Sequence, residues 1–290
     1  MNKTQQLHAW LLLLPALVML AAFTHIPAVQ TLLHSFYDNP RGGNPASFVG
    51  MENFQYLYED EVFWQVLWNN AWYAIVTVPV SIVLALVMAL WVNARLPGRG
   101  IVRLAYFTPT VLPMIAVANI WLFFYTPEIG LFNNVLNMFG FDGQNWLGDP
   151  DFALPSLMVM TIWKEAGFFM IFYLAALQGL DNSLYEAAAI ENASRWQVFR
   201  RITWPLLMPT TLFILINALI NAFKLVDHLF ILTKGGPNNA SNLLLYYIYE
   251  NAFSFFDSAY AATLTSVMLI ILALLAWVQF GILDKRVHYR

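Results

Sequence analysis

Cysteine is absent from this 290-residue sequence, and charged residues are scarce. Without Cys there is no disulfide framework, no thiolate metal site and no cysteine for attaching a lipid. Asp, Glu, Lys and Arg make up 11% of the chain, less than half of the roughly 25% found in soluble domains. The basic residues form no stripe with interleaved aromatic side chains, so the sequence offers no support for nucleic-acid binding.

Motifs for nucleotide binding and catalysis are also missing. The sequence contains no G-x-x-x-x-G-K-[ST] loop, and its five His include no H-E-x-x-H spacing. An intramembrane enzyme would need clustered metal ligands or a nucleophile beside a base, and the sequence shows neither. We therefore expect no catalytic residue, no metal site and no cofactor in this chain.

What the sequence has in abundance is apolar residues, which make up 60% of it. A water-soluble protein of this size could not bury that much apolar surface. A 22-residue run at residues 71–92 would form a helix roughly 33 Å long, enough to cross about 30 Å of hydrocarbon. The sequence predicts an all-α integral membrane protein with six transmembrane helices, in one membrane domain spanning residues 1–290. The expected helices are about 9–36, 71–92, 104–125, 152–177, 203–231 and 259–283.

The first apolar segment has an alternative interpretation as a cleaved signal peptide, because Lys3 precedes a short apolar core. The apolar character continues to Leu33, however, and no small-x-small cleavage site follows. We expect the segment to be retained as a transmembrane helix.

Basic residues near the ends of the segments predict the orientation, because cytoplasmic loops are enriched in Lys and Arg. With both termini inside, only Arg41 and Lys234 lie on the outer side, and Lys164 and Lys224 lie within apolar segments. The cytoplasmic side then holds Lys3, Arg95, Arg99, Arg103, Arg195, Arg200, Arg201, Lys285, Arg286 and Arg290. We therefore expect the N-in, C-in topology.

A polar stretch at Asp181–Pro209 lies between two apolar segments on the predicted cytoplasmic side. Ser183 stands three residues before Glu186, and Ser194 stands three before Gln197, which is the spacing of a helix capping box. The stretch therefore predicts two short helices. Asn192 lies between them, and Asn enters the left-handed conformation readily enough to end a helix. A helix-turn-helix this short cannot bury a core of its own, so we expect it to dock on another protein.

The stretch resembles the EAA loop of membrane subunits of binding-protein-dependent ABC importers. The family pattern is E-A-A, then an acidic residue, Gly and Ala, followed by Phe, Ile and two prolines at fixed offsets. One position departs from it, since Asn192 stands where the family usually has Gly. The matching positions are Glu186, Ala187, Ala188, Glu191, Asn192, Ala193, Phe199, Ile202, Pro205 and Pro209.

The resemblance extends over nearly the whole chain and narrows to carbohydrate-type permeases similar to those of maltose transporters, of the first of their two permease types. Outer-loop elements similar to the family's occur in its order. They are V-G-x-x-N-F at residues 49–54, Leu112-Pro113 with Trp121, then Pro127, Gly130 and Asn133, and T-x-G-G-P at residues 233–237.

This resemblance implies a heteromeric importer in the bacterial inner membrane. The chain would pair with a second, similar permease, with two copies of a cytoplasmic ATPase that bind ATP and Mg²⁺, and with a periplasmic or lipid-anchored solute-binding protein. Glu186 would anchor the loop to the ATPase, and Ala187 and Ala188 would allow close approach. Phe199 and Ile202 would pack the second helix of the loop. ATP binding would move the loop and rock the permeases between inward and outward openings.

Ionisable groups inside the apolar segments are candidates for a substrate pathway, because such groups usually face a bundle interior or an aqueous cavity. Lys164 and Glu165 lie in the fourth segment, and Lys224 and Asp227 in the fifth. Adjacent residues point in different directions, so Lys164 and Glu165 should each have a partner of its own. Lys224 and Asp227 could instead neutralise each other at the i, i+3 spacing.

The fifth segment also carries a polar stripe, because Asn217, Asn221, Lys224 and His228 fall on one helical face. Amides suit ligands rich in hydroxyl groups, since they offer donors and acceptors together. The alternative is that these side chains hydrogen-bond neighbouring helices. We place His228 near the outer surface, as a solvated or capping residue. The candidate pathway residues are Asn217, Asn221, Lys224, Lys164 and Glu165.

We consider three alternative functions for this chain. The first is an ATP-driven import permease for a sugar or sugar derivative. The second keeps that architecture but carries an anionic polyol or sugar bearing phosphate or sulfonate, because two membrane lysines could attract such a group. The third, of another class, is an ATPase-independent secondary transporter. Such a carrier would have no use for a capped cytoplasmic docking loop.

Overall fold

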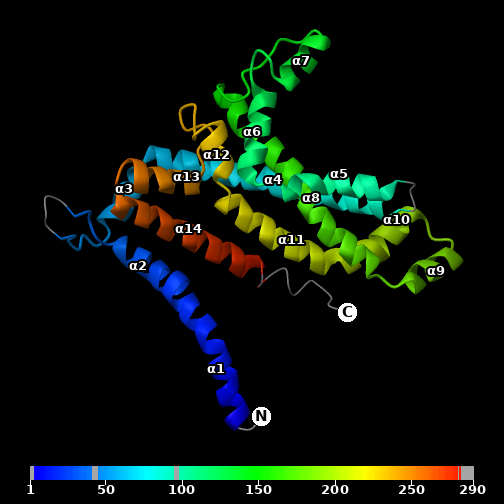
Figure 1. Ribbon diagram of the computed structural model, residues 1–290, viewed down its shortest axis with the longest axis horizontal. Helices are drawn as coiled ribbons and strands as arrows, with labels where there is room; N and C mark the ends of the chain where they lie inside the picture. Colours follow the sequence, from blue (N-terminus) through cyan, green and yellow to red (C-terminus); the bar gives the residue numbers. More distant parts are fainter. Residues whose placement is uncertain (1–2, 41–44, 95–97, 280, 282–290) are drawn as a thin grey trace. The chain divides into compact units, whose positions relative to one another are not determined.

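The computed structural model describes residues 3–40, 45–94, 98–279 and 281 as helices joined by short connections (Figure 1). The described chain falls into two compact units. Its elements are α1 (Lys3–Leu20), η1 (Ala21–His25), α2 (Ile26–His34), α3 (Glu52–Glu59), α4 (Glu61–Asn93), α5 (Arg99–Val111), α6 (Met114–Tyr125), α7 (Leu131–Met138), α8 (Pro150–Gln178), α9 (Asn182–Ile190), α10 (Arg195–Val198), η2 (Phe199–Thr203), α11 (Trp204–Lys224), α12 (Asp227–Leu232), α13 (Leu244–Tyr249), η3 (Glu250–Ser254) and α14 (Ser258–Val278).

Unit 1 comprises Met1–Phe63 and Ile248–Ile271. Its first helix runs from α1 through the π-helical turn η1 into α2. The π turn ends two residues before Pro27, which has no N–H to donate to the preceding turn. The span His8–His34 buries none of its residues within the described chain, although it is apolar throughout. Lipid or another membrane protein must therefore cover it.

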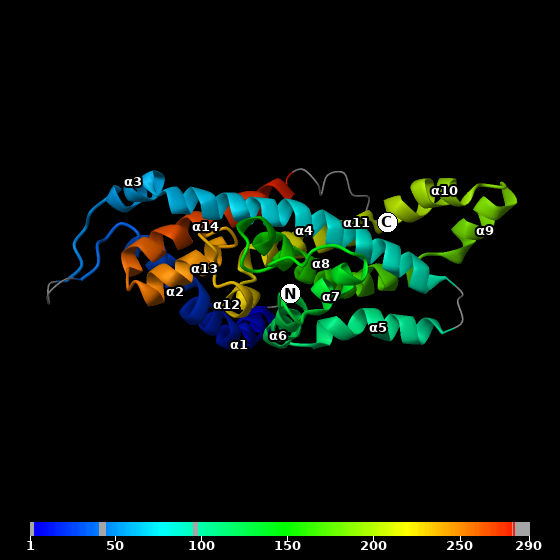
Figure 2. The same ribbon diagram turned by 90° about the horizontal axis from the view of Figure 1, so that it is seen from above.

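Unit 2 comprises Trp64–Tyr247 and Leu272–Arg290 and is built around α8. This helix packs against α5 and α11 (Figure 2). Gly167 shows how closely α8 approaches α5, because a Cβ at that position would lie 2.2 Å from the carbonyl oxygen of Tyr106. The sides of α8 toward its neighbours are correspondingly buried, with Phe169, Met170 and Tyr173 fully enclosed.

In the described part of the chain, five helical stretches are long and apolar enough to cross a membrane, or six if the bent pair α5 and α6 counts as one span. The chain is thus an all-helical membrane protein. Several spans begin before the expected positions, the first at Lys3, α4 at Glu61, α5 at Arg99 and α8 at Pro150. The expected end of the last helix, Leu283, lies outside the described residues.

The helix expected at 104–125 is not continuous. It divides into α5 and α6, which are bent by 103° at Leu112 and Pro113. Pro113 lacks an N–H and forces the residue before it out of the helical region, and Leu112 accordingly has φ −75° and ψ 135°. The ammonium of Lys164 donates to two carbonyls freed by the break, those of Pro109 at 2.9 Å and Leu112 at 2.6 Å.

The helix expected at 203–231 is also broken. It ends at Lys224, Leu225 is extended with ψ 113°, and the chain resumes as the short helix α12. Neither Pro nor Gly lies at this break, so local sequence does not explain it. Instead α12 packs against α6, a contact between two spans that a continuous helix would not make.

Candidate functional site

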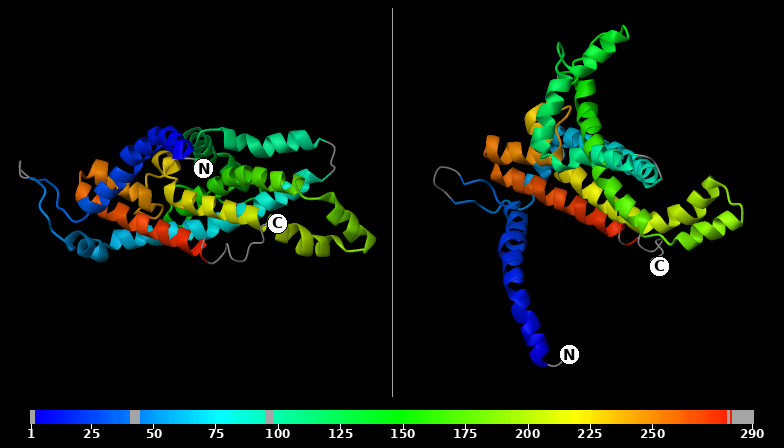
Figure 3. Two further views of the ribbon diagram at one scale, coloured as in Figure 1. Left: turned by 90° about the horizontal axis from the view of Figure 1, so that it is seen from below. Right: turned by 45° about the vertical axis from the view of Figure 1, so that its right-hand side comes forward.

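The segment with the capping signals forms a helical hairpin, α9 and α10, at one end of unit 2 (Figure 3). The first cap differs from the expected one. Asp181, not Ser183, is the N-cap residue of α9, and its Oδ1 accepts a hydrogen bond from the Ser183 amide at 2.9 Å. The carboxylate reaches the free amide of the first turn from one residue before the helix, so Ser183 lies inside it. This bond holds the pKa of Asp181 below its ordinary value.

The turn and the second cap confirm their predictions. Asn192 is left-handed with φ 51°. Its amide donates to Ala189, and the amide of Ala193 donates to Ala188, which is the Schellman pattern for ending a helix. Ser194 and Gln197 form the complete capping box, in which the Ser194 hydroxyl accepts from the Gln197 amide and the Gln197 side chain accepts from the Ser194 amide.

The hairpin leaves apolar and charged groups exposed together. Ile190 is 82% exposed and Trp196 is 66% exposed, although both are large apolar side chains. Glu186 lies on the exposed surface of α9. Patches of this kind usually mark a surface that another protein covers.

The other residues of the expected loop motif have different surroundings. Ala187 and Glu191 are exposed, whereas Ala188 is buried and Ala193 is half-buried. Phe199 and Ile202 are half-buried. The Phe199 ring stacks on that of Trp196 with 5.6 Å between their centroids. The hydroxyl of Tyr185 lies 3.1 Å from that of Thr203, which ties α9 to the start of the following span.

A groove with a volume of about 840 Å³ lies between this hairpin and the end of α4. Its apolar lining includes Leu90 and Trp91 from α4, with Tyr185, Trp196 and Phe199 from the hairpin. The hairpin therefore stands away from the spans instead of packing flat on them.

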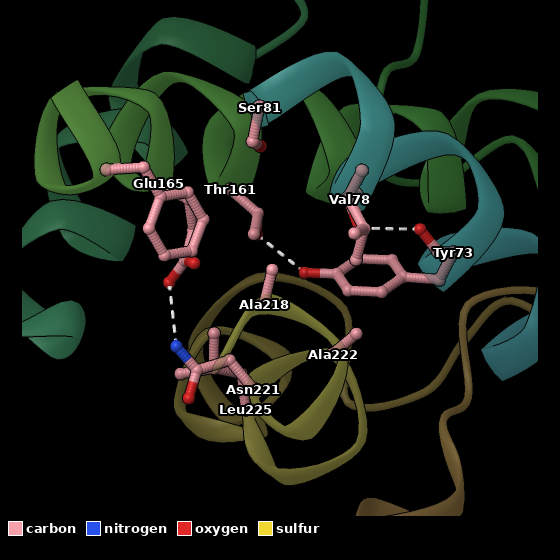
Figure 4. Close-up of a pocket in the computed structure, with 11 residues that line it drawn as sticks. Tyr73, Val78, Ser81, Thr161, Glu165, Ala218, Asn221, Ala222 and Leu225 are labelled. Carbon is pink, nitrogen blue, oxygen red and sulfur yellow. Dashed lines mark hydrogen bonds between the residues drawn. The ribbon is translucent and has the colours of Figure 1, made fainter. Parts of the chain in front are cut away.

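The second candidate region is a small polar cavity inside unit 2, between α4, α8 and α11 (Figure 4). It brings together two of the predicted pathway residues, because Asn221 Nδ2 donates to Glu165 Oε1 at 3.5 Å. Tyr73 and Thr161 also line it, and their hydroxyls are 2.6 Å apart. Its volume of about 10 Å³ is about that of a single water position.

The remaining pathway candidates are not gathered at this cavity. Asn217 is half-buried and donates to the carbonyl of Phe213 in its own helix at 2.8 Å. Lys224 is exposed at the last position of α11, and Lys164 holds the break between α5 and α6. The helical neutralisation considered for Lys224 and Asp227 does not apply, because the helix ends between them and both are exposed.

The expectation that His228 is a solvated or capping residue is wrong. The break after α11 turns α12 against α6, and His228 is completely buried. Its Nε2 lies 3.3 Å from the hydroxyl of Tyr73, and the two rings stack. His228 and Tyr73 therefore belong to the polar interior of unit 2.

Sequence reasoning missed the buried amides that fasten this interior. Asn70 donates to the carbonyl of Ala222 at 3.3 Å and accepts from the amide of Leu244 at 3.1 Å. Its neighbour Asn69 donates to the carbonyls of Asn239 and Asn242. Both Asn lie just before the apolar run expected at 71–92, so the sequence did not mark them as interior residues. The structure extends α4 back to Glu61 and buries them.

The chain also matches known proteins. Residues 81–289 match the family model described as the binding-protein-dependent transport system inner membrane component. The chain belongs to this family. An inner-membrane component of this kind is a multi-pass permease subunit of an ABC importer, and ATP hydrolysis takes place on partner subunits.

Relatives of this inner-membrane component match it over nearly its whole length. It is 34% identical to the sulfoquinovosyl glycerol transport system permease protein SmoG of Agrobacterium fabrum, over 91% of this chain and 86% of SmoG. It is 34% identical to the lactose transport system permease protein LacF of Rhizobium radiobacter, over 97% and 95% of the two chains. A chain of the bacterial alginate ABC transporter, solved in complex with an alginate pentasaccharide-bound periplasmic protein, superposes with a TM-score of 0.87. The superposition covers 98% of this permease and 96% of that chain at 22% identity, which shows a shared fold.

Proposed function

We propose that this permease imports a sugar or sugar derivative by alternating access, and that the segment Asp181–Pro209 couples it to the ATPase. The observation that supports this proposal is the α9–α10 hairpin, whose two helices are capped and which exposes Glu186, Ile190 and Trp196. Capping at Asp181, Asn192 and Ser194 fixes the shape of the hairpin without a core, so force applied to it can pass to α8 and α11 on either side.

The proposed topology places both termini and the hairpin on the cytoplasmic side. Arg99 and Arg103 at the start of α5 then share a side with Arg195 of α10. Lys234 follows α12 at the other end of its span. Of the other basic residues that support this orientation, Arg95, Lys285, Arg286 and Arg290 lie outside the described residues, as does Arg41 of the outer side.

The proposed assembly contains a second, similar permease, two cytoplasmic ATPase subunits that bind ATP and Mg²⁺, and a periplasmic or lipid-anchored solute-binding protein. The family description itself makes transport dependent on a binding protein. Within this assembly Ala187 would permit close approach of the ATPase, and Phe199 and Ile202 would hold the hairpin's second helix.

Co-purification tests the coupling proposal. In the assembled importer, Glu186→Arg should weaken retention of the ATPase by about 30-fold or more, since reversing a charge at an interface leaves its partner unpaired. Glu128→Arg is the matched control, because Glu128 is exposed and lies at the far end of α6 on the proposed outer side. Equal ATPase retention by both variants would refute docking through Glu186. An importer that still transports without its ATPase would support the secondary carrier instead.

The names of two relatives and the polar interior support the proposed substrate class. The names of SmoG and LacF give a sulfonated sugar derivative and a neutral disaccharide, and the Glu165–Asn221 pair offers a carboxylate and an amide that suit hydroxyl groups. We propose that Asn217, Asn221 and Glu165 line the route. Lys164 is less suited to an anionic group than its charge suggests, because two carbonyls occupy its ammonium. Lys224 is exposed and free of that restraint.

Uptake assays separate the neutral and anionic substrates. Lys224→Ala should reduce uptake of a phosphate- or sulfonate-bearing sugar at least tenfold if Lys224 contacts it, and should leave a neutral sugar unaffected. Asn221→Ala should reduce uptake of either. Unchanged transport of every substrate by the Lys224 and Lys164 alanine variants would exclude direct contact between the lysines and the substrate.

A further inference from the structure

A second cavity in unit 2 lies away from the polar interior, where α4 and α8 end and α5 begins. Its volume is about 130 Å³, enough to admit a group the size of phosphate. Its polar lining consists of Asn93 from α4, Arg99 and Arg103 from α5, and Gln178 from α8. Among the described residues no carboxylate lines it, so the cavity offers hydrogen-bond donors and positive charge.

These four side chains have no ion pair or hydrogen bond with any other residue in the described part of the chain. Arg99 and Arg103 are four residues apart on α5, so they share a helix face, where like charges repel. A guanidinium has five N–H donors in a planar fork that matches the oxygens of phosphate. All four side chains are exposed, so an oxyanion here would replace water as their hydrogen-bond partner. Two such forks beside two amides match the oxygens of that anion.

The local backbone also favours an anion in this cavity. The first turn of α5 leaves free amides at this end of the cavity, beginning after Gly98, which is left-handed with φ 76°. Gly100 also lines the cavity, and a Cβ there would meet nothing within 4 Å, so the anion's space is not filled by the chain. The carboxyl ends of α4 and α8 each contribute about half a negative charge. Their sum of about −1 does not balance two full guanidinium charges.

The surroundings indicate that the anion is attached to a lipid. The cavity lies at the level where three membrane-embedded helices begin or end, which is the headgroup region. Large apolar side chains in the first turns of α5 are exposed, Ile101 by 75% and Leu104 by 65%. A ligand with a phosphate at the arginines and acyl chains along these residues satisfies both surfaces.

We propose that the cavity between α4, α5 and α8 binds the phosphate of an anionic membrane lipid. Arg99 and Arg103 hold the phosphate oxygens, Gln178 and Asn93 donate further hydrogen bonds, and Ile101 and Leu104 contact the acyl chains. The bound lipid ties the start of α5 to the ends of its two neighbours. The site depends on its position at the helix ends and not on which side of the membrane they lie.

Native mass spectrometry of the purified full chain in detergent tests the proposal by titration with phosphatidylglycerol. The variant Arg99→Gln/Arg103→Gln should bind this lipid at least tenfold more weakly than the wild type, because it loses two charge-assisted contacts. Arg200→Gln/Arg201→Gln is the matched control, with the same loss of charge at exposed positions outside the cavity. It should bind as the wild type does. If both double variants weaken binding equally, general attraction between charges explains the result and the proposed site is wrong.

Two further ligands distinguish the source of the phosphate. Phosphatidylcholine, whose headgroup has no net charge, should bind at least tenfold more weakly than phosphatidylglycerol. Inorganic phosphate or glycerol phosphate should not displace the lipid at the same concentration, and displacement would show that the site takes a soluble anion instead. Should the glutamine double variant fail to fold, Arg99→Lys/Arg103→Lys keeps the charge but loses the forks. Unaltered lipid affinity in that variant would refute the bidentate contacts.

Discussion

Replacing Asn133 should strongly destabilise the connection between α6 and α8. The side chain of Asn133 is 1% exposed. Its amide nitrogen donates to the carbonyls of Pro127 at 2.7 Å and Gln144 at 2.8 Å. Its oxygen accepts from the Gln144 amide at 3.0 Å and the Trp146 indole at 2.8 Å. All four bonds hold segments on either side of α7.

The magnitude follows from those four bonds. Each contributes about 1 kcal/mol net, and the groups left behind by Asn133→Ala regain part of this from water. The local free energy of opening should therefore fall by about 2–4 kcal/mol, which raises the opening equilibrium constant roughly 30- to 1,000-fold. Asn133→Asp should be at least as disruptive at neutral pH, because a carboxylate oxygen would then face the carbonyls of Pro127 and Gln144.

Hydrogen exchange measured by mass spectrometry reports the effect directly, since the Gln144 amide is itself a donor to Asn133. Peptides covering residues 139–149 should exchange faster in Asn133→Ala by the factor above. The neighbouring Asn134→Ala is the control, because Asn134 is exposed and makes a 3.2 Å bond to Ile129. It should change exchange by less than about tenfold. Equal exchange in the two variants would refute the assignment of the connection's stability to Asn133.

Two further substitutions test helix packing and the hairpin turn. Gly167→Ala should lower the free energy of unfolding by about 1–3 kcal/mol, because its Cβ would meet the Tyr106 carbonyl. The control is Gly100→Ala in α5, whose Cβ would meet nothing, and it should be neutral or stabilising by up to about 1 kcal/mol. Equal melting temperatures for both would contradict the close approach of α8 and α5. Asn192→Val should destabilise the hairpin by about 1–2 kcal/mol through its left-handed φ, and Asn192→Gly should not. Proteolysis within residues 181–204 measures this, and a Val variant cut no faster than the Gly variant would contradict it.

Local signals in the sequence predicted the hairpin and most of the spans. Asn192 and the Ser194–Gln197 box needed only their immediate neighbours, so their structure could be anticipated from spacing. The cap at Asp181 was missed because Ser183 offered the same chemistry two residues later, and only geometry separates them. The break at Pro113 could have been anticipated, since a residue before proline avoids the helical region.

The polar interior was harder to predict because contacts between distant helices create it. Leu225 interrupts α11 without a Pro or Gly, and that interruption buries His228. The pairing of Asn221 with Glu165 was not visible from either helix alone, although both residues were identified as candidates. The role of Lys164 also depended on the break in another span. Polarity in the sequence thus located the right residues, and tertiary packing determined their partners.

The bend between α5 and α6 has a consequence for the thickness of this part of the protein. Thirteen residues of α5 rise about 20 Å, roughly two-thirds of the hydrocarbon depth, before the chain turns aside. Lys164 lies at this elbow, where its ammonium donates to the carbonyls of Pro109 and Leu112. Helix α5 alone is therefore too short to cross the hydrocarbon, and a crossing here depends on α6, which continues at a bend of 103° to it.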